Sequence, residues 1–207
     1  MFADRVTAGT QLAHAVSELA LPDPVVLGLP RGGVPVAAEV ARVLQAPLDV
    51  LIVRKVGSPH HQEFAVGAVG EGGVVIAHRR DLVAAGITPQ QFQTLAAAEA
   101  EQVRNRAHLF RPHREMTSIA GRDAVIVDDG LATGATAEAA IAVARAHQPR
   151  SLTLAVPVAP ADSLDRLGGL VDHLVCLLAP SYFGAVGAFY SDFGQVSDAE
   201  VLDILAS

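Results

Sequence analysis

Cysteine, lysine and positive charge are all scarce in this sequence. Its 207 residues contain one cysteine, Cys176, and one lysine, Lys55. A single cysteine excludes an intrachain disulfide and a cysteine-based metal cluster, and it fits a reducing compartment, so we expect a cytoplasmic protein. The 15 basic residues stand against 22 acidic ones, which gives a formal charge of -7. A broad phosphate-backbone interface needs clustered cations, so no nucleic-acid partner is expected.

The sequence also lacks an uninterrupted apolar run of the kind that crosses a membrane. The uncharged stretch over residues 174–191 is broken by Pro180, Gly184 and Gly187, and its first part is typical of a buried strand. The N-terminus has charged residues early and no sustained apolar segment, so a secretory signal is not expected. We therefore expect no association with a membrane.

Apolar surface, in contrast, is abundant: 51% of the residues are hydrophobic and 18% are charged. This composition predicts one folded domain with its own core. Short apolar runs alternate with helical patterns, which indicates a three-layer α/β/α fold with a mainly parallel central sheet. We expect strands over residues 24–29, 48–53, 74–77, 124–127, 151–156 and 173–178. We expect helices over residues 34–44, 89–111 and 135–147, the second of them with Thr88 as N-cap and Pro89 at its first position. A capping box of Ser197 and Glu200 opens a last helix.

The most informative segment is an apolar strand that ends in Asp128 and Asp129 and continues into a turn and a helix, AVIVDDGLATGAT over residues 124–136. Ligands of open α/β folds bind at the carboxyl edge of the sheet. Adjacent carboxylates there can accept hydrogen bonds from the vicinal hydroxyls of a sugar, or hold Mg²⁺ through its waters. The turn has no bulky side chain, so its backbone N–H groups can wrap a phosphate. The segment thus describes a ribose 5-phosphate site, with the phosphate at Ala132, Thr133, Gly134, Ala135 and Thr136.

This segment resembles the signature of the type I phosphoribosyltransferases, which bind 5-phosphoribosyl 1-pyrophosphate (PRPP) through four apolar residues, two acids and a turn closing in Thr-Gly-x-Thr. The whole chain resembles a bacterial group of such proteins of about this length. The resemblance implies a single domain over residues 1–207, with a flexible loop over 57–73, a helical insertion over 88–111 and a C-terminal, acceptor-side hood over 179–207. It also loosely implies a homodimer.

A second segment, LGLPRGGVP over residues 27–35, follows the first expected strand. In the resembled family the loop at this place binds pyrophosphate through backbone N–H groups, often across a cis peptide. The resemblance therefore puts Arg31, Gly32 and Gly33 at the pyrophosphate, and the peptide from Pro30 to Arg31 is the candidate cis bond. Taken alone, the glycine pair indicates only a turn from strand to helix.

Arg54 and Lys55 follow the expected second strand, at the sheet edge where the acids are also expected. Cations there can neutralise pyrophosphate as it departs, and a solvated strand end accounts for them equally well. The glycine-rich segment after them indicates a mobile loop or a hairpin, and it fits the family's loop that closes over PRPP. An isolated pair of histidines in that loop does not indicate a metal site. Three of its polar residues are candidates for substrate contact or are simply exposed: His60, His61 and Glu63.

Five of the nine aromatic residues gather after the last expected strand, within residues 182–193. A nucleobase needs a flat apolar face to stack on, and a hydrophobic tail packed under the sheet is an equally good account. The cluster loosely resembles the purine-binding end of 6-oxopurine phosphoribosyltransferases, which implies these base-side residues: Tyr182, Phe183, Val186, Tyr190 and Asp192. The spacing from Gly187 to Asp192 is one residue longer than in those enzymes. Ala132 replaces an acid that helps move the proton of the base, which puts hypoxanthine and guanine in doubt as substrates.

The resemblance implies a Mg²⁺-dependent transfer of phosphoribose from PRPP to a nucleobase or amine nitrogen, with release of pyrophosphate. Asp128 and Asp129 would hold the ribose hydroxyls, and the metal through water or those hydroxyls, while Arg31 and Lys55 act on the leaving group. The alternative is a PRPP-binding regulator without transfer. A receiver-type signalling domain and a P-loop nucleotide-triphosphatase do not fit, since no lysine follows residue 55 and no Gly-Lys-Ser/Thr sequence occurs.

Overall fold

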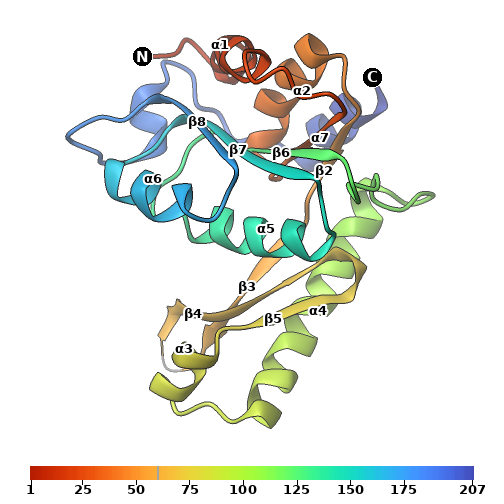
Figure 1. Ribbon diagram of the computed structural model, residues 1–207, viewed down its shortest axis with the longest axis vertical. Coiled ribbons are helices and arrows are strands. Elements are labelled where there is room, and N and C mark those ends of the chain that lie inside the picture. Colours follow the sequence, from red (N-terminus) through yellow and green to blue (C-terminus); the bar gives the residue numbers. More distant parts are fainter. Residues whose placement is uncertain (60) are drawn as a thin grey trace.

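The chain folds into a larger body built on a parallel sheet and a smaller lobe built on an antiparallel sheet (Figure 1). The computed structural model describes residues 1–59 and 61–207, and for residues 61–64 it describes the backbone alone. In the larger sheet the strands stand in the order β2-β1-β6-β7-β8, and every neighbouring pair is parallel. The bounds of these strands are β1 Pro24–Gly28, β2 Leu48–Val50, β6 Asp123–Val127, β7 Ser151–Val158 and β8 His173–Leu178.

Helices cover both faces of this sheet. Helices α1, Arg5–Ser17, and α2, Gly33–Leu44, pack on one face. Helices α5, Ala135–Ala146, and α6, Ala161–Gly168, pack on the other (Figure 1). The predicted three-layer α/β/α fold with a parallel central sheet is therefore confirmed.

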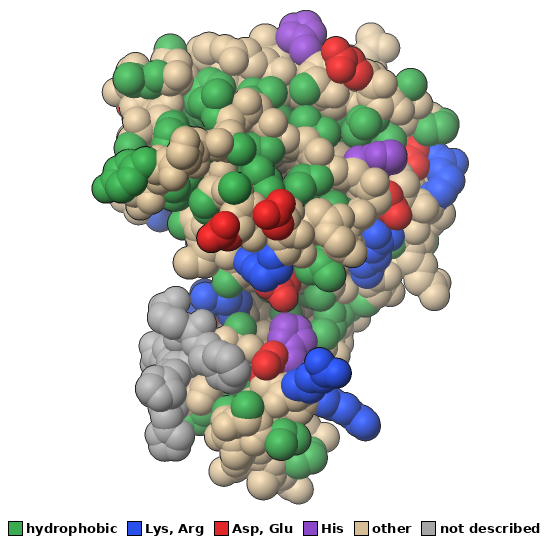
Figure 2. Space-filling model, turned by 60° about the vertical axis from the view of Figure 1, so that its left-hand side comes forward, with side chains coloured by type: hydrophobic (Ala, Val, Ile, Leu, Met, Phe, Trp, Pro, Cys, Tyr) green, Lys and Arg blue, Asp and Glu red, His purple; other side chains and the backbone are tan. Residues whose placement is uncertain are grey.

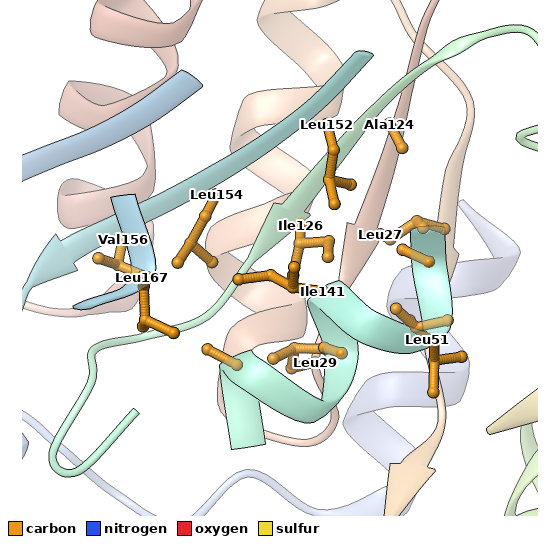
Figure 3. Close-up of a cluster of buried hydrophobic side chains, with 14 of the residues drawn as sticks. Leu27, Leu29, Leu51, Ala124, Ile126, Ile141, Leu152, Leu154, Val156 and Leu167 are labelled. Carbon is orange, nitrogen blue, oxygen red and sulfur yellow. The ribbon is translucent and has the colours of Figure 1, made fainter. Parts of the chain in front are cut away.

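Strand β6 is buried along its whole length, which explains why its sequence is a continuous apolar run rather than an alternating one. Ala124 and Ile126 join the core beneath α5, while Val125 and Val127 join the core beneath α1 and α2. Figure 3 shows the first of these cores, where strand side chains gather around Ile141 of α5. Packing on both faces fixes the carboxyl ends of β1 and β6 side by side.

The smaller lobe contains three antiparallel strands in the order β3-β4-β5. The sheet packs against α4, and helix α5 lies between it and the parallel sheet (Figure 1). Thr88 caps α4 in a capping box with Gln91, and Pro89 stands at its first turn, as the sequence predicted for this start. The bounds of the lobe are β3 Val53–Ser58, β4 His61–Gly70, the 3-10 helix η1 Glu71–Gly73, β5 Val74–Ala77, α3 Arg79–Ala84 and α4 Pro89–Phe110.

One expectation about this lobe needs correction. The strand expected over residues 48–53 ends at Val50, so Arg54 and Lys55 belong to β3 of the lobe. For the segment 57–73 the sequence indicated a loop or a hairpin, and of the two the structure shows the hairpin, since the segment consists largely of β3, β4 and η1. Its glycines serve close packing: a Cβ atom on Gly70 would lie 2.2 Å from Cγ1 of Val143 in α5. Glycine content alone does not distinguish this use from an irregular backbone.

A buried ion-pair network holds the point where the chain leaves the parallel sheet. The guanidinium of Arg111 donates to Oδ1 of Asp49 at 2.7 Å and also binds the carboxylate of Glu71. Oε1 of Glu71 accepts from the N–H of Ile52 at 2.9 Å. Buried charges persist only when they are paired in this way. The network therefore fixes where β2 ends and β3 begins.

Residues 179–207 form the short 3-10 helix η2, Val186–Phe189, and the helix α7, Asp198–Ala206. The capping box predicted for Ser197 and Glu200 is present at the start of α7. Helix α7 packs against α2 and α4, so the C-terminal segment reaches both the body and the lobe. Across the described residues, no helix combines the length and the apolar character that a membrane crossing needs.

Candidate functional site

The two acids stand between the end of β6 and the start of α5, as predicted. Asp128 and Asp129 are both partly exposed, and 14% of the Asp129 side chain is accessible. The N–H of Asp129 donates to Oδ1 of Asp128 at 2.9 Å, so the backbone orients the first carboxylate. Both residues are thus partly exposed at this sheet edge, where ligands of open α/β folds bind.

The turn that follows the acids leads directly into the first turn of α5. Ala132, Thr133 and Thr136 are exposed and Ala135 is partly exposed, so these residues can meet a ligand. Gly134 is the N-cap residue and has φ of +72°, a left-handed conformation that glycine adopts without steric cost. The structure thus places the predicted phosphate turn at a helix N-terminus, where backbone N–H groups lack intrahelical partners.

The Arg-Gly-Gly turn packs directly against the acids. The peptide between Pro30 and Arg31 is cis, as the resemblance implied. A Cβ atom on Gly32 would lie 2.1 Å from Oδ2 of Asp129, and one on Gly33 would lie 2.7 Å from the carbonyl oxygen of Val127. Gly32 has φ of -60°, so space rather than backbone conformation requires glycine here. The two motifs therefore form one continuous surface.

Arg5, at the start of α1, binds the second acid. Its Nε donates to Oδ2 of Asp129 at 2.8 Å, and its Nη1 donates to the carbonyl oxygen of Gly194 at 2.7 Å. Its Cζ lies 3.9 Å from the centroid of the Phe193 ring, a cation–π contact. Only 12% of the Arg5 side chain is exposed. Arg5 thus connects the N-terminal helix and the C-terminal segment with residues 128–130, which we call the acid turn.

Burial raises the pKa of both acids, because desolvation penalises the charged form. For Asp128 the pKa lies well above its ordinary value, and the negative charge of Asp129 raises it further. For Asp129 the hydrogen bond from Arg5 opposes the effect of burial. Arg5 therefore favours the ionised form of Asp129.

Tyr190, expected as a stacking face for a base, lies beside the second acid. Its hydroxyl donates to the backbone carbonyl oxygen of Asp129 at 2.6 Å. Its ring is buried and packs against the rings of Phe2 and Phe193, whose centroids lie 5.4 Å and 4.9 Å away. Burial raises the pKa of the Tyr190 hydroxyl, which therefore stays protonated and can donate. Tyr190 thus contacts the backbone at Asp129, and its role as a stacking face for a base stays a prediction.

The other base-side candidates do not gather in one pocket. Tyr182 is 87% exposed. Phe183 stacks on Phe189 at 5.4 Å, and Asp192 is exposed and accepts from the N–H of Gly194. Val186 lies against the acid turn, since a Cβ atom on Gly130 would be 2.6 Å from its Cγ1. Of the five candidates, the structure brings Val186 and Tyr190 to the acids.

A cleft of 440 Å³ opens beside the Arg-Gly-Gly turn, between the body and the lobe. Arg31, Arg54 and Arg106 line it together with Thr136 of the phosphate turn. An adjoining cavity of 330 Å³ is lined by Arg54, Lys55 and Thr136. Figure 2 shows basic, acidic and histidine side chains gathered where the larger body meets the lobe. Lys55 thus lies in β3 and still reaches the cavity beside the phosphate turn.

Two further cavities are lined by charged side chains, and they differ in whether those side chains are already paired within the protein. One of 410 Å³ is lined by Arg5, Arg31, Asp129 and Phe193, so it shares the wall of the acid site. One of 510 Å³ lies near the C-terminal end of α5 and is lined by Arg111 and other residues. Arg111 is already paired with Asp49 and Glu71. We therefore place the candidate site at the acids and not at the larger cavity.

Across the described residues, no group of three or more histidine, cysteine, aspartate or glutamate side chains is arranged to hold a metal ion. His60 lies outside the described residues, as do the side chains of His61 and Glu63. Asp128 and Asp129 supply the hard oxygen ligands that Mg²⁺ prefers. They fit an ion that is bound mainly by a substrate's oxygens and by water.

Sequence reasoning missed Arg5, which lines the acid site, and Arg106, which lines the cleft. Arg5 reaches its acid partner across 124 positions and Arg106 reaches Asp198 across 92. No local pattern links residues that far apart.

Comparisons with known proteins agree with this geometry. A family model described as "Phosphoribosyl transferase domain" matches residues 6–178. Rv0571c of Mycobacterium tuberculosis, provisionally named a phosphoribosyl transferase, is 48% identical over 205 residues, which covers 99% of this chain and 46% of that protein. The chain thus spans about half the length of the curated relatives that it matches.

Among solved structures, the Thermus thermophilus protein TT1426 is 48% identical, with a TM-score of 0.92 over 99% of this chain and 97% of that one. The Aquifex aeolicus protein AQ2163 is 14% identical, with a TM-score of 0.50 over 84% of this chain and 73% of that one. At that identity the second match indicates a shared fold alone.

Proposed function

Because this chain belongs to the phosphoribosyl transferase family, we propose that it moves phosphoribose from PRPP to a nitrogen nucleophile and releases pyrophosphate. One observation carries the proposal. Gly32 and Gly33 of the Arg-Gly-Gly turn lie in direct contact with the end of β6 and with Asp129. A pyrophosphate-binding turn, a pair of acids and a phosphate turn then form one surface, which matches the three parts of PRPP.

Each part of this surface has a defined task in the proposal. Oδ2 of Asp129 and Oδ1 of Asp128 are used in hydrogen bonds within the protein, and each carboxylate has a second oxygen that can accept from a ribose hydroxyl. The turn from Ala132 to Thr136 holds the 5′-phosphate with backbone N–H groups. Arg31, Gly32 and Gly33 hold the pyrophosphate.

The reaction breaks the bond between the anomeric carbon and pyrophosphate, and forms a bond from that carbon to the acceptor nitrogen. Positive charge develops on the ribose and negative charge on the departing pyrophosphate. The adjacent carboxylates stabilise the first, and Arg31, Arg54 and Lys55 stabilise the second. Positioning and electrostatics suffice, so no covalent intermediate with the protein is needed.

Mg²⁺ would bind the oxygens of PRPP beside Asp128 and Asp129, either through water or through the ribose hydroxyls. When bound, the ion would neutralise charge on the diphosphate. The pair of acids alone does not make a protein cage for it, which predicts that Mg²⁺ binds weakly without PRPP and tightly with it.

The acceptor is proposed to be a nucleobase or an amine that enters beside the C-terminal segment. Val186 lies against the acid turn and Phe193 lines the cavity of 410 Å³ that includes Asp129. Phe183 and Tyr182 lie further along the same segment, and Asp192 is exposed there. Ala132 leaves the phosphate turn without a side chain that could move a proton, so an acceptor that needs no such help fits best.

The alternative is a PRPP-binding regulator that performs no transfer, and the same alanine favours it. Pyrophosphate release from PRPP and Mg²⁺, measured across purines, pyrimidines and small amines, separates the two. Release with one acceptor identifies the enzyme and its substrate. PRPP binding without release from any acceptor supports the regulator, and absence of PRPP binding contradicts both.

We also propose that the protein is cytoplasmic and forms a homodimer, on the basis of its single cysteine and its family. Sedimentation equilibrium of the purified chain tests the second point, and a monomer at micromolar concentration would contradict it.

A further inference from the structure

A single carboxylate on α7 bridges two arginines of the cleft. Arg106 of α4 donates from Nη1 and Nη2 to the two carboxylate oxygens of Asp198, both at 2.9 Å. Nη1 of Arg31, in the Arg-Gly-Gly turn, lies 4.0 Å from Oδ1 of the same carboxylate. The two guanidinium groups are therefore close enough for one anion to bind both.

The cleft that contains these arginines carries an excess of positive charge on its walls. Arg31, Arg54 and Arg106 all line it, and Thr136 connects it to the phosphate turn. Arg54 is paired with Glu99 at 2.7 Å, as Arg106 is paired with Asp198. Each pair leaves the guanidinium with further N–H groups, since a guanidinium has five.

The pair between Arg106 and Asp198 is suited to exchange. Its side chains are 35% and 37% exposed, and solvent-exposed ion pairs contribute little net free energy. The hydrogen bond from Arg106 keeps the pKa of Asp198 below its ordinary value, so the carboxylate is ionised at neutral pH. A diphosphate carries more negative charge than a carboxylate and offers more oxygens for bidentate binding by arginine.

We propose that Arg106 is a diphosphate-binding residue, and that Asp198 holds the place of the diphosphate between Arg106 and Arg31 until PRPP displaces it. This inference rests on the proposed function and adds two residues to it. The ion pair between α4 and α7 is therefore broken when the diphosphate half of PRPP binds. Ribose 5-phosphate, which lacks a diphosphate, leaves the pair in place.

The experiment measures the binding of PRPP, inorganic pyrophosphate and ribose 5-phosphate by calorimetry, with Mg²⁺ present. The variants are Arg106→Ala, Asp198→Asn and the matched control Arg104→Ala, which removes an exposed arginine of the same helix. We expect Arg106→Ala to weaken the binding of PRPP and of pyrophosphate about ten-fold or more, because a charge-assisted hydrogen bond is lost. Ribose 5-phosphate should bind it as it binds the wild type.

Asp198→Asn distinguishes a placeholder from a simple tether between α4 and α7. A placeholder competes with the ligand, so its neutral variant should bind pyrophosphate several-fold more tightly. Unchanged pyrophosphate binding in both variants, with an equal loss of thermal stability, would show a tether and overturn the proposal. Equal weakening of all three ligands by Arg106→Ala would overturn it as well.

The same measurements distinguish a failure of the proposed function from a failure of the role proposed for Arg106 and Asp198. If the wild type bound neither PRPP nor ribose 5-phosphate, the assignment of the acid site itself would be wrong. If the wild type bound both and Arg106→Ala bound PRPP equally well, only the role of Arg106 and Asp198 would be lost. Arg104→Ala should bind every ligand like the wild type.

Discussion

Arg5 and Asp129 are 124 positions apart in the sequence, yet Nε of the arginine lies 2.8 Å from Oδ2 of the acid. The same guanidinium stacks over Phe193 and donates to the carbonyl oxygen of Gly194. The second acid of the site is thus held by both ends of the chain. Its protonation depends on a residue that stands outside the acid motif.

Replacing Arg5 by alanine tests this dependence. Burial raises the pKa of Asp129 and Arg5 opposes that rise, so the variant should have a still higher pKa at Asp129. A protonated carboxyl is a poorer acceptor for ribose hydroxyls. We therefore expect ribose 5-phosphate binding to weaken about ten-fold near neutral pH and to recover as the pH increases. Calorimetry across pH measures this, with Arg80→Ala, an exposed arginine of the lobe, as the control. An unshifted pH profile would contradict the role.

Gly32→Ala should disrupt the site through space alone. The added Cβ would lie 2.1 Å from Oδ2 of Asp129, which Arg5 holds in place. Overpacking of this kind costs about 1–3 kcal/mol, and we expect PRPP affinity to fall by a corresponding factor while the fold persists. Binding and circular dichroism check both points. Gly169→Ala is the matched control, since a Cβ there meets no atom within 4 Å. Equal affinity in both variants would refute the contact.

Asp128→Asn should make the protein more stable and at the same time less able to bind PRPP. The folded-state pKa of Asp128 is raised by burial and by the charge of Asp129, so its ionisation destabilises the fold. At a pH below about 4 the carboxyl is protonated in both states and the variant gains nothing. The gain appears as the pH rises from there to the folded-state pKa, and it is then constant. We expect about 0.5–2 kcal/mol at neutral pH from chemical denaturation. A destabilised variant at neutral pH would contradict this.

Gly70→Ala should loosen the lobe from the body. Its Cβ would lie 2.2 Å from Cγ1 of Val143, so β4 could not keep its distance from α5. We expect a loss of about 1–3 kcal/mol in the free energy of unfolding. Val143→Ala in the same chain should restore part of that loss, because the two sites share one contact. A double-mutant cycle measures the coupling, and purely additive losses would show that the contact does not matter.

Features that depend on neighbouring residues could be predicted from the sequence, while features that depend on contacts between distant residues could not. The run before Asp128 is apolar at every position because β6 is buried on both faces, so the strand and its acidic end could be read locally. Thr88 and Ser197 announced two helix starts through capping, which involves only neighbouring residues. Arg54 and Lys55 were expected just after the second strand of the parallel sheet, but they belong to β3. The chain leaves the parallel sheet after Val50, where Asp49, Glu71 and Arg111 form a buried network that no local pattern indicates.

By itself the sequence determined the layered α/β architecture, the acids at a strand end and the glycines of two turns. Each of these follows from side-chain periodicity or from backbone requirements within a few residues. Only the tertiary structure decided that Gly32 touches Asp129, that Arg5 binds this acid, and that the Tyr190 hydroxyl donates to the backbone beside it. Those contacts join segments from opposite ends of the chain, and their energies depend on burial and distance, which local spacing does not encode.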